Sequence, residues 1–166
     1  MWQALMDHFR RYPAQERVVR LLIQNGLRIE GETVFAGTVA VADTALARAA
    51  DVDRRIVRAT VQTINEDAEL HRAFSRFAPT LHLKDVAPEL GYGVIQITPT
   101  NASQPGILAG VSGVIAEAGI SIRQAVVDDP AFTDAPRLFV VTEARVPPSL
   151  IPAIQAVPGV KAVTIY

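Results

Sequence analysis

The stretch Pro99-Thr-Asn-Ala-Ser-Gln-Pro-Gly-Ile-Leu108 decides the fold expected for the C-terminal half of this sequence. An apolar run at residues 92–98 precedes it, and an apolar stripe with helical spacing continues from residue 105 to 118. Proline is well tolerated in the first turn of a helix, and a helix N-terminus offers unpaired N–H groups to an anion. The stretch therefore predicts a strand, a polar loop and a helix whose N-terminus suits a carboxylate.

The residues that follow predict the rest of a small two-layer domain. Strands are expected at 120–127, 137–145 and 159–166, and a short helix is expected at 147–157. With right-handed crossovers, the order βαββαβ gives a ferredoxin-like antiparallel sheet with both helices on one face. The other face of such a sheet needs cover.

Two glycines inside the predicted helix at 105–118 indicate close packing. Gly110 and Gly113 each cost the helix about 1 kcal/mol relative to alanine. A neighbouring backbone pressed against this side would explain them, so an association surface is expected there. The alternative is an ordinary solvent face rich in alanine and glycine.

Residues 1–90 form a charge-rich and mainly helical half. They hold 12 Lys/Arg and 12 Asp/Glu, whereas residues 91–166 hold 4 and 5, which indicates two modules with a boundary near residue 90. Helical spacing and turn signals predict helices at 1–11 and from Pro13 to Asn25, a hairpin around Gly31 and one more helix after residue 68.

A helix-turn-helix spacing lies within the first half. One helix is predicted at 42–50, and a second runs from the N-cap Asp53 to about residue 66. The pair resembles the two core helices of winged helix-turn-helix regulators, in which the second helix enters the DNA major groove. The candidate DNA-binding residues are Arg48, Arg54, Arg55 and Arg58. A solvated arginine face is the alternative, because neighbouring carboxylates would weaken a positive field.

Composition removes several classes of function. Zero cysteines exclude disulfides, thiolate nucleophiles and cysteine-ligated metals. His8, His71 and His82 have no second ligand or base nearby, and the nucleotide-binding fingerprints are missing. We therefore expect no metal, no cofactor and no catalytic residue.

Charge and hydropathy bear on location and on partners. A formal charge of −1 argues against bulk binding to nucleic acid or to a membrane surface. No run approaches the ~18 to 20 apolar residues of a spanning helix, and no signal-peptide pattern opens the sequence. A cytoplasmic protein with no membrane contact is expected.

The run from Ser103 to Ile122 resembles ACT domains, whose usual form is a polar residue, any residue, Pro-Gly-hydrophobic-Leu and later Gly-hydrophobic-Asn-Ile. The matching runs are Ser103-Gln-Pro-Gly-Ile-Leu and Gly119-Ile-Ser-Ile. The ending Val157-Pro-Gly-Val-Lys-Ala-Val-Thr-Ile-Tyr resembles the closing segment of the ACT domain in phosphoglycerate dehydrogenases. The resemblance covers nearly all of residues 92–166.

This resemblance implies an effector site between the loop before the first helix and the start of the second strand, commonly across a paired-domain interface. Ser103 and Ser121 stand where the family often has Asp or Asn, and their hydroxyls reach less far. The candidate effector-binding residues of this sequence are Asn101, Ser103, Gln104, Gly106, Ile107 and Ser121.

The two halves together resemble small archaeal and bacterial proteins described as predicted regulators of amino-acid metabolism. The resemblance implies an α+β protein with a helix-turn-helix-like domain at 1–90 and an ACT-like domain at 91–166. It also implies a non-enzyme that forms a homodimer or higher homo-oligomer and binds a free amino acid, with DNA as a second partner. The alternative is a regulatory subunit that binds no DNA and confers amino-acid sensitivity on a biosynthetic enzyme.

Overall fold

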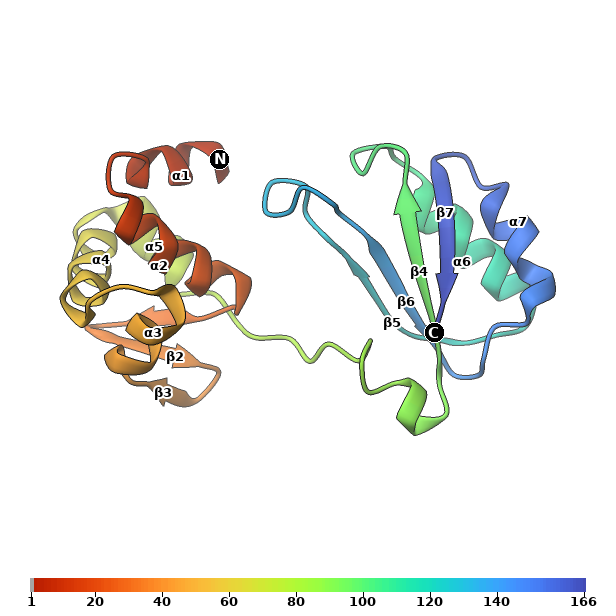
Figure 1. Ribbon diagram of the computed structural model, residues 1–166, viewed down its shortest axis with the longest axis horizontal. Helices are drawn as coiled ribbons and strands as arrows, with labels where there is room; N and C mark the ends of the chain where they lie inside the picture. Colours follow the sequence, from red (N-terminus) through yellow and green to blue (C-terminus); the bar gives the residue numbers. More distant parts are fainter. Residues whose placement is uncertain (1) are drawn as a thin grey trace. The chain divides into compact units, whose positions relative to one another are not determined.

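The computed structural model describes residues 2–166 and divides the chain between Thr80 and Leu81 into two compact units, each with its own core (Figure 1). Met1, which belongs to the first predicted helix, and the side chains of residues 2–5 lie outside the described part. The sequence predicts a boundary at 90/91, so residues 81–90 belong to the other unit in the structure. Residues 88–91 instead form a short helical turn, η1 (Pro88–Leu90) with Gly91 as its C-cap, inside the second unit. No helix in the described part is long and apolar enough to cross a bilayer.

The first unit is mainly helical, as the sequence predicts. Its helices are α1 (Trp2–Phe9), α2 (Pro13–Gln24), α3 (Asp43–Ala50), α4 (Arg54–Glu66) and α5 (Ala68–Phe74). Between α2 and α3, an antiparallel sheet in the order β1-β2-β3 consists of β1 (Arg28–Glu30), β2 (Thr33–Ala36) and β3 (Val39–Val41). The predicted hairpin around Gly31 is confirmed, and β3 extends it by a strand that the sequence did not indicate.

The turn between α3 and α4 is held by an arginine from another helix. Asp51 has a φ of 52°, a left-handed conformation that aspartate tolerates better than most residues. The Arg17 side chain donates hydrogen bonds to the carbonyl oxygens of Ala50 at 3.1 Å and Asp51 at 3.0 Å. Asp53 then caps α4 by accepting a hydrogen bond from the backbone N–H of Arg55 at 2.8 Å. The helix-turn-helix geometry thus depends on α2 as well as on its own residues.

Replacing Arg17 with alanine should lower the free energy of unfolding by about 1 kcal/mol, because two carbonyl oxygens at the end of α3 lose a charged donor. Urea denaturation of the purified protein measures the change. Arg20→Ala is the matched control, since Arg20 only pairs with Glu16 one turn away on the same exposed helix face. Such a pair contributes about 0.5 kcal/mol at most. Equal losses in both variants would contradict the role given to Arg17.

The second unit has the predicted ferredoxin-like order βαββαβ. Its strands are β4 (Gly93–Pro99), β5 (Ile122–Val127), β6 (Leu138–Thr142) and β7 (Val160–Ile165), which form an antiparallel sheet in the order β5-β6-β4-β7. Its helices are η1 (Pro88–Leu90), α6 (Ile107–Glu117), η2 (Pro148–Leu150) and α7 (Ile151–Gln155). The central strand β4 pairs with β6 on one side and with β7 on the other.

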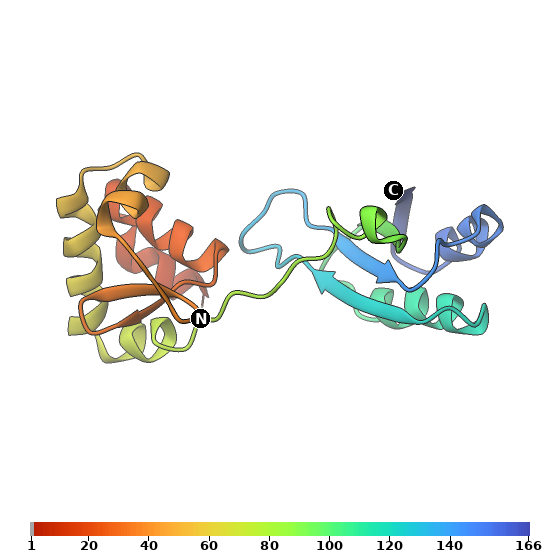
Figure 2. The same ribbon diagram turned by 90° about the horizontal axis from the view of Figure 1, so that it is seen from below.

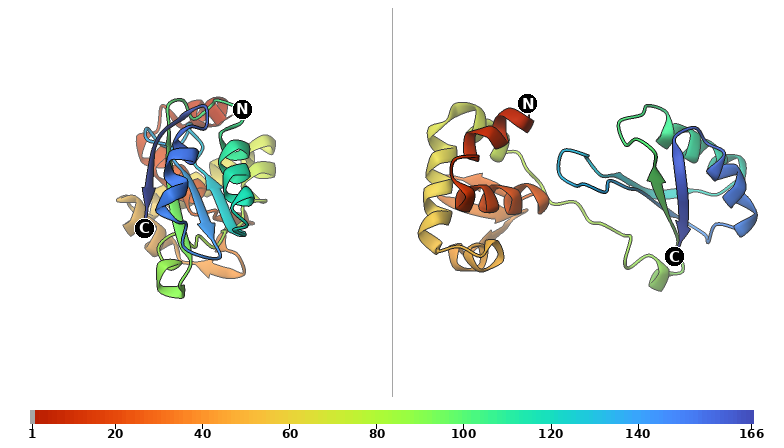
Figure 3. Two further views of the ribbon diagram at one scale, coloured as in Figure 1. Left: turned by 90° about the vertical axis from the view of Figure 1, so that its right-hand side faces the viewer. Right: turned by 45° about the horizontal axis from the view of Figure 1, so that its top comes forward.

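One face of this sheet packs against α6 and α7, which lie side by side in front of the strands (Figure 3, left). Alternate strand positions, such as Ile95 and Val140, point into this core, and Val111 and Ile115 fill it from α6. All four side chains are fully buried. The apolar residues that alternate along the strands and those that recur at helical spacing along α6 therefore pack together in one apolar layer.

The opposite face is partly covered by residues 81–87, here called the strap. The side-chain amide of Gln124 on β5 holds it at two points: its Oε1 accepts from the backbone N–H of Leu83 at 2.8 Å, and its Nε2 donates to the carbonyl oxygen of Leu81. Further along, Lys84 lies 4.7 Å above the ring of Phe139 on β6. A single glutamine thus fastens a segment 41 residues away in sequence.

The strap continues into a small second core. Ala87 is completely buried against Val94 of β4 and Val141 of β6, on the face that points away from α6. Figure 2 shows η1, which follows the strap, and α6 on opposite sides of the sheet. This packing places residues 81–90 in the second unit.

Replacing Gln124 with alanine should release the strap and accelerate tryptic cleavage after Lys84 by about tenfold or more, because two hydrogen bonds of about 1 kcal/mol each are lost. Limited proteolysis followed by mass spectrometry measures the rate at that bond. Gln96→Ala is the control, because Gln96 lies on the same sheet face and bonds the Tyr166 hydroxyl at 2.9 Å instead of the strap. Unchanged cleavage in Gln124→Ala would show that the amide does not hold the strap.

Candidate functional sites

The loop between β4 and α6 is fixed by its own turn and by the turn that precedes β7. Thr100 donates from its backbone N–H to the carbonyl oxygen of Gly159 at 2.8 Å, and its hydroxyl lies 3.2 Å from the same oxygen. Within the loop, Asn101 Oδ1 accepts from the N–H of Ser103 at 2.9 Å, and Asn101 O accepts from the N–H of Gln104 at 3.1 Å. These hydrogen bonds fix the conformation of the loop.

The two stretches that resemble ACT domains touch each other. A Cβ added to Gly159 would lie 2.8 to 2.9 Å from the side-chain amide of Gln104, and Gly159 has a φ of 93°. The positive φ favours glycine at this position. Gln104 therefore packs over the turn before β7, which joins two motifs separated by more than fifty residues.

The N-terminus of α6 has no side-chain cap. Gly106 is the N-cap residue and has a φ of 93°. This backbone conformation favours glycine, so the presence of glycine here does not by itself indicate a bound ligand. Ser103 does not cap the helix. The first N–H groups of α6, including that of Ile107, are left to solvent or to a ligand.

A cavity of about 130 Å³ lies beside this helix start. Of the predicted effector-binding residues, Gln104, Gly106 and Ile107 line it, whereas Asn101 and Ser103 do not. The rest of the lining comes partly from the loop and α6 and partly from the facing ends of β5 and β6, where Val127, Asp128, Arg137 and Leu138 lie. The cavity therefore lies at the end of the sheet where β4 stops, β5 stops and β6 begins.

Ser121 lies at the opposite end of the sheet. It precedes Ile122, which pairs with Thr142 of β6, and Thr142 in turn pairs with Gly93 at the start of β4. Within one chain, the structure therefore does not bring Ser121 together with the loop residues. The resemblance places this position across a paired interface, where the Ser121 of a second copy would be the relevant one.

The sequence did not identify Asp128 and Arg137 as site residues. Asp128 and Arg137 are joined across the β5–β6 hairpin: the Asp128 backbone N–H donates to Arg137 O at 2.9 Å, and Asp128 Oδ2 accepts from the Arg137 N–H at 3.0 Å. The predicted topology could have identified their position. In the βαββαβ order, the end of β5 and the start of β6 lie at the same end of the sheet as the loop that follows β4.

The glycines of α6 have different explanations. A Cβ on Gly110 would lie 2.5 Å from Cγ1 of Val157, so this glycine allows α6 to pack against the end of α7 in the same chain. The expectation that a neighbouring backbone requires Gly110 is therefore wrong. Gly113 is exposed, and a Cβ there would meet nothing within 4 Å. Only Gly113 remains available for association with another molecule.

Gly110→Leu should lower the free energy of unfolding by about 1–3 kcal/mol through overpacking against Val157. Gly113→Leu should leave the fold intact and raise helix stability by up to about 1 kcal/mol. Thermal denaturation distinguishes the two variants, and sedimentation shows whether Gly113→Leu also weakens self-association. Unchanged self-association in Gly113→Leu would mean that this side of α6 faces solvent.

The predicted DNA-binding arginines are all exposed, and two of them are paired within the first unit. Arg55 Nε lies 3.2 Å from Asp53 Oδ1, and Arg58 Nε lies 2.7 Å from Asp43 Oδ2. The backbone N–H of Arg55, followed by its side chain, holds the pKa of Asp53 below its usual value. Asp43 raises the pKa of the Arg58 guanidinium. Arg54 forms no salt bridge with any described residue.

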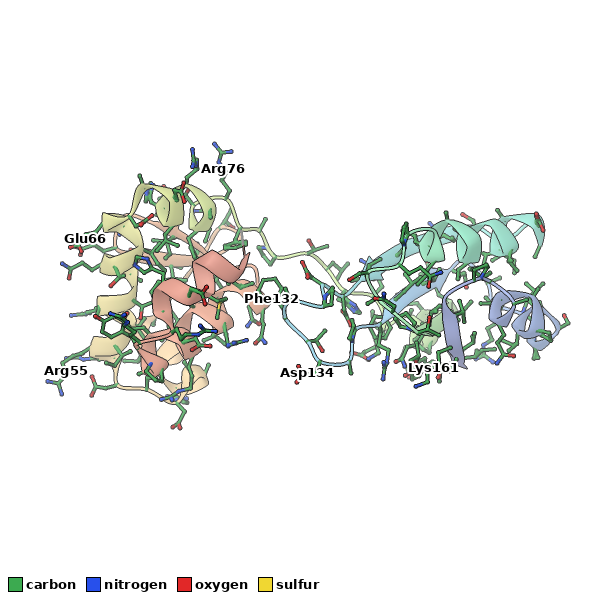
Figure 4. The ribbon with its side chains drawn as sticks, turned by 90° about the horizontal axis from the view of Figure 1, so that it is seen from above. Arg55, Glu66, Arg76, Phe132, Asp134 and Lys161 are labelled. Carbon is green, nitrogen blue, oxygen red and sulfur yellow. The ribbon has the colours of Figure 1, made fainter. Side chains whose placement is uncertain are left out.

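Figure 4 shows Arg55 and Glu66 at opposite ends of α4, both directed away from the rest of the first unit. Arg48 is exposed on α3, so the four arginines lie on the two helices of the helix-turn-helix. The charge along α4 therefore changes from positive at its start to negative at its end.

An open groove of about 1020 Å³ runs between α4 and the three-stranded sheet. Its charged lining consists of Glu32, Asp43, Arg58 and Glu66. Asn65 also lines it: its Nδ2 donates to Gly31 O at 2.7 Å, while its Oδ1 is buried with no hydrogen-bond partner among the described residues. The groove therefore has three carboxylates and one guanidinium, so its charge is negative. The positive surface is confined to the first turns of α4.

Residues 2–166 contain no cluster of three or more side chains suited to hold a metal ion. No family model and no curated protein matches the sequence.

Several solved structures match parts of this chain, all at low identity and with TM-scores below 0.5. The C-terminal domain of the MgtC protein from Mycobacterium tuberculosis is 24% identical over 45% of this chain and 83% of its own length, with a TM-score of 0.35. The leucine response regulatory protein of the same organism is 15% identical over 93% of this chain and 90% of its own, with a TM-score of 0.28. A homoserine dehydrogenase from Thiobacillus denitrificans is 16% identical over 69% of this chain and 28% of its own, with a TM-score of 0.36. None of these likenesses assigns a function to the chain.

Proposed function

We propose that the protein is an amino-acid-responsive transcriptional regulator of amino-acid metabolism, which contacts DNA through α4 and binds a free amino acid at the start of α6. One observation carries the proposal: a single chain joins a helix-turn-helix with exposed arginines to a ferredoxin-like unit with a cavity at an uncapped helix N-terminus. The first feature suits DNA, and the second suits a small carboxylate.

The arginine pairs leave α4 free to bind phosphate. Exposed ion pairs contribute about 0–1 kcal/mol, so a DNA phosphate can replace a carboxylate as the partner of Arg55 or Arg58 at little cost. Asp53 keeps its capping bond when the Arg55 side chain moves, because that bond comes from the Arg55 backbone. Neither exchange requires α4 to unwind.

The effector would act on a homodimer or higher homo-oligomer. β5 is an edge strand with an unpaired side, and Gly113 is exposed on α6, so the second unit has surfaces available to a second copy. Pairing is also what would bring Ser121 of that copy toward the loop. An amino acid then regulates DNA binding only if it has different affinities for two arrangements of the dimer.

The Arg54/Arg55/Arg58→Ala variant should lose selection of a recurrent DNA site from genomic fragments. Wild-type binding should weaken steeply with salt, and each phosphate-contacting arginine removed should flatten the log–log slope by about one. Arg20/Arg72/Arg76→Ala is the matched control, because it removes the same charge from exposed positions outside the helix-turn-helix. Equal losses in both variants, or no enrichment by the wild type at low salt, would contradict DNA reading by α4.

A second candidate function is a regulatory subunit for a biosynthetic enzyme. The acidic lining of the groove beside α4 favours it, because Glu32 and Glu66 repel phosphate and suit a basic protein surface. Co-purification of a biosynthetic enzyme, together with no enrichment of DNA fragments, would support this function over the first.

A further inference from the structure

We propose that Arg58 contacts a guanine base of the DNA site and that Asp43, which holds the Arg58 guanidinium, is the positioning residue for this contact. The inference rests on the proposed function and deepens it by naming the base that α4 recognises. Its basis is the geometry of one exposed ion pair between α3 and α4.

The pair uses only one of the three guanidinium nitrogen atoms. Arg58 Nε donates to Asp43 Oδ2 at 2.7 Å, and neither Nη group forms a hydrogen bond with a described residue. The two N–H groups at the end of the fork are therefore free. In the major groove, guanine presents two adjacent acceptors, O6 and N7, which arginine binds through two parallel hydrogen bonds. Arg58 can make this contact while its Nε stays bonded to Asp43.

Asp43 restrains a side chain that would otherwise rotate freely. The Arg58 side chain is 68% exposed, whereas that of Asp43 is 26% exposed at the start of α3. Long exposed side chains lose conformational entropy when a ligand immobilises them. The Asp43 bond removes part of this entropy before DNA binds, and it directs the guanidinium relative to both helices. A contact that requires one defined geometry gains from such restraint.

The charges around Arg58 favour a base over a phosphate as its partner. Asp43, and after it Glu32, raise the pKa of the Arg58 guanidinium, and Glu66 lines the same groove. These carboxylates repel a phosphate, whereas the edge of a guanine has no net charge. Arg54, exposed at the start of α4 with no carboxylate partner among the described residues, suits a phosphate better.

The similar pair at Arg55 cannot separate orientation from folding. Arg55 Nε lies 3.2 Å from Asp53 Oδ1, and the same oxygen accepts the hydrogen bond that caps α4. Asp43, in contrast, accepts no hydrogen bond from any described residue except Arg58, and the N-cap of α3 is Ala42. Asp43 can therefore be replaced without removing a helix cap.

The test begins with the DNA site that the wild-type protein selects from genomic fragments, and with binding to copies of that site changed at each base pair. One guanine should be preferred over the other bases by about tenfold or more, as for a bidentate contact. Arg58→Lys keeps the charge but lacks the fork, so it should lose this preference while the salt dependence stays unchanged.

Asp43→Ala should change affinity and base preference in opposite directions. Binding to DNA without the site should strengthen, because one repulsive carboxylate is removed. The guanine preference should be largely lost, because the guanidinium is no longer held. Asp43→Asn removes the same charge but keeps an oxygen that accepts from Arg58 Nε, so it should retain the preference. If Asn and Ala behaved alike, Asp43 would act through its charge or through folding, and its positioning role would be overturned.

Glu66→Ala is the matched control, because Glu66 has the same charge, lines the same groove and bonds Gln62 instead of an arginine. It should leave the guanine preference unchanged, and thermal denaturation should show all four variants folded. A selected site without a guanine preference, or with one that survives Arg58→Lys, would overturn the inference and leave DNA binding by α4 standing. If the wild type selects no site at low salt, DNA binding and this inference fail together.

Discussion

β4 is hydrogen-bonded along both sides, and the arrangement of the second unit depends on this double pairing. On one side, Ile97 faces Leu138 of β6, and on the other it faces Val163 of β7. The chain leaving β4 must therefore pass between the start of β6 and the turn before β7. That constraint places Gln104 on Gly159 and sets the start of α6 beside Asp128 and Arg137. The central strand thus assembles a site from segments that are far apart in sequence.

In the first unit, the start of α4 combines opposing electrostatic effects. Arginines at a helix N-terminus are unfavourable, because the helix dipole is already positive there. Arg54 and Arg55 stand at this position nonetheless. Asp53 offsets them as a capping carboxylate, and Asp43 offsets Arg58 from the neighbouring helix. An arrangement that costs helix stability and needs two carboxylates to offset it is expected where the positive surface serves a purpose other than folding.

The elements with strong local patterns could be predicted from the sequence. Helical spacing and the cap Asp53 identified α3 and α4, and the Pro-Gly loop with apolar runs on either side identified β4 and α6. The ferredoxin-like order followed from these signals. They are local, because each depends on residues within a turn or two of one another.

Features that depend on distant partners could not be predicted in this way. The strap has no periodic pattern, and its fastening residue, Gln124, lies on a strand of another segment. Gly110 indicated close packing, but its partner Val157 became evident only from the position of α7. Arg137 and Asp128 each looked like ordinary residues of a hairpin, and only the end-to-end alignment of β4, β5 and β6 places them at a common cavity.

The strap determines where the second unit can be separated from the first without exposing apolar surface. A fragment that began at residue 91, at the boundary expected from the sequence, would lack Ala87 and leave Val94 and Val141 uncovered. Phe139 would lose Lys84 from its ring as well. A contiguous apolar patch on a sheet promotes aggregation in a soluble fragment. A fragment that began at residue 81 would retain this cover. Residues 81–90, which have no periodic sequence pattern, therefore determine whether one face of the sheet is exposed to solvent or both faces are covered.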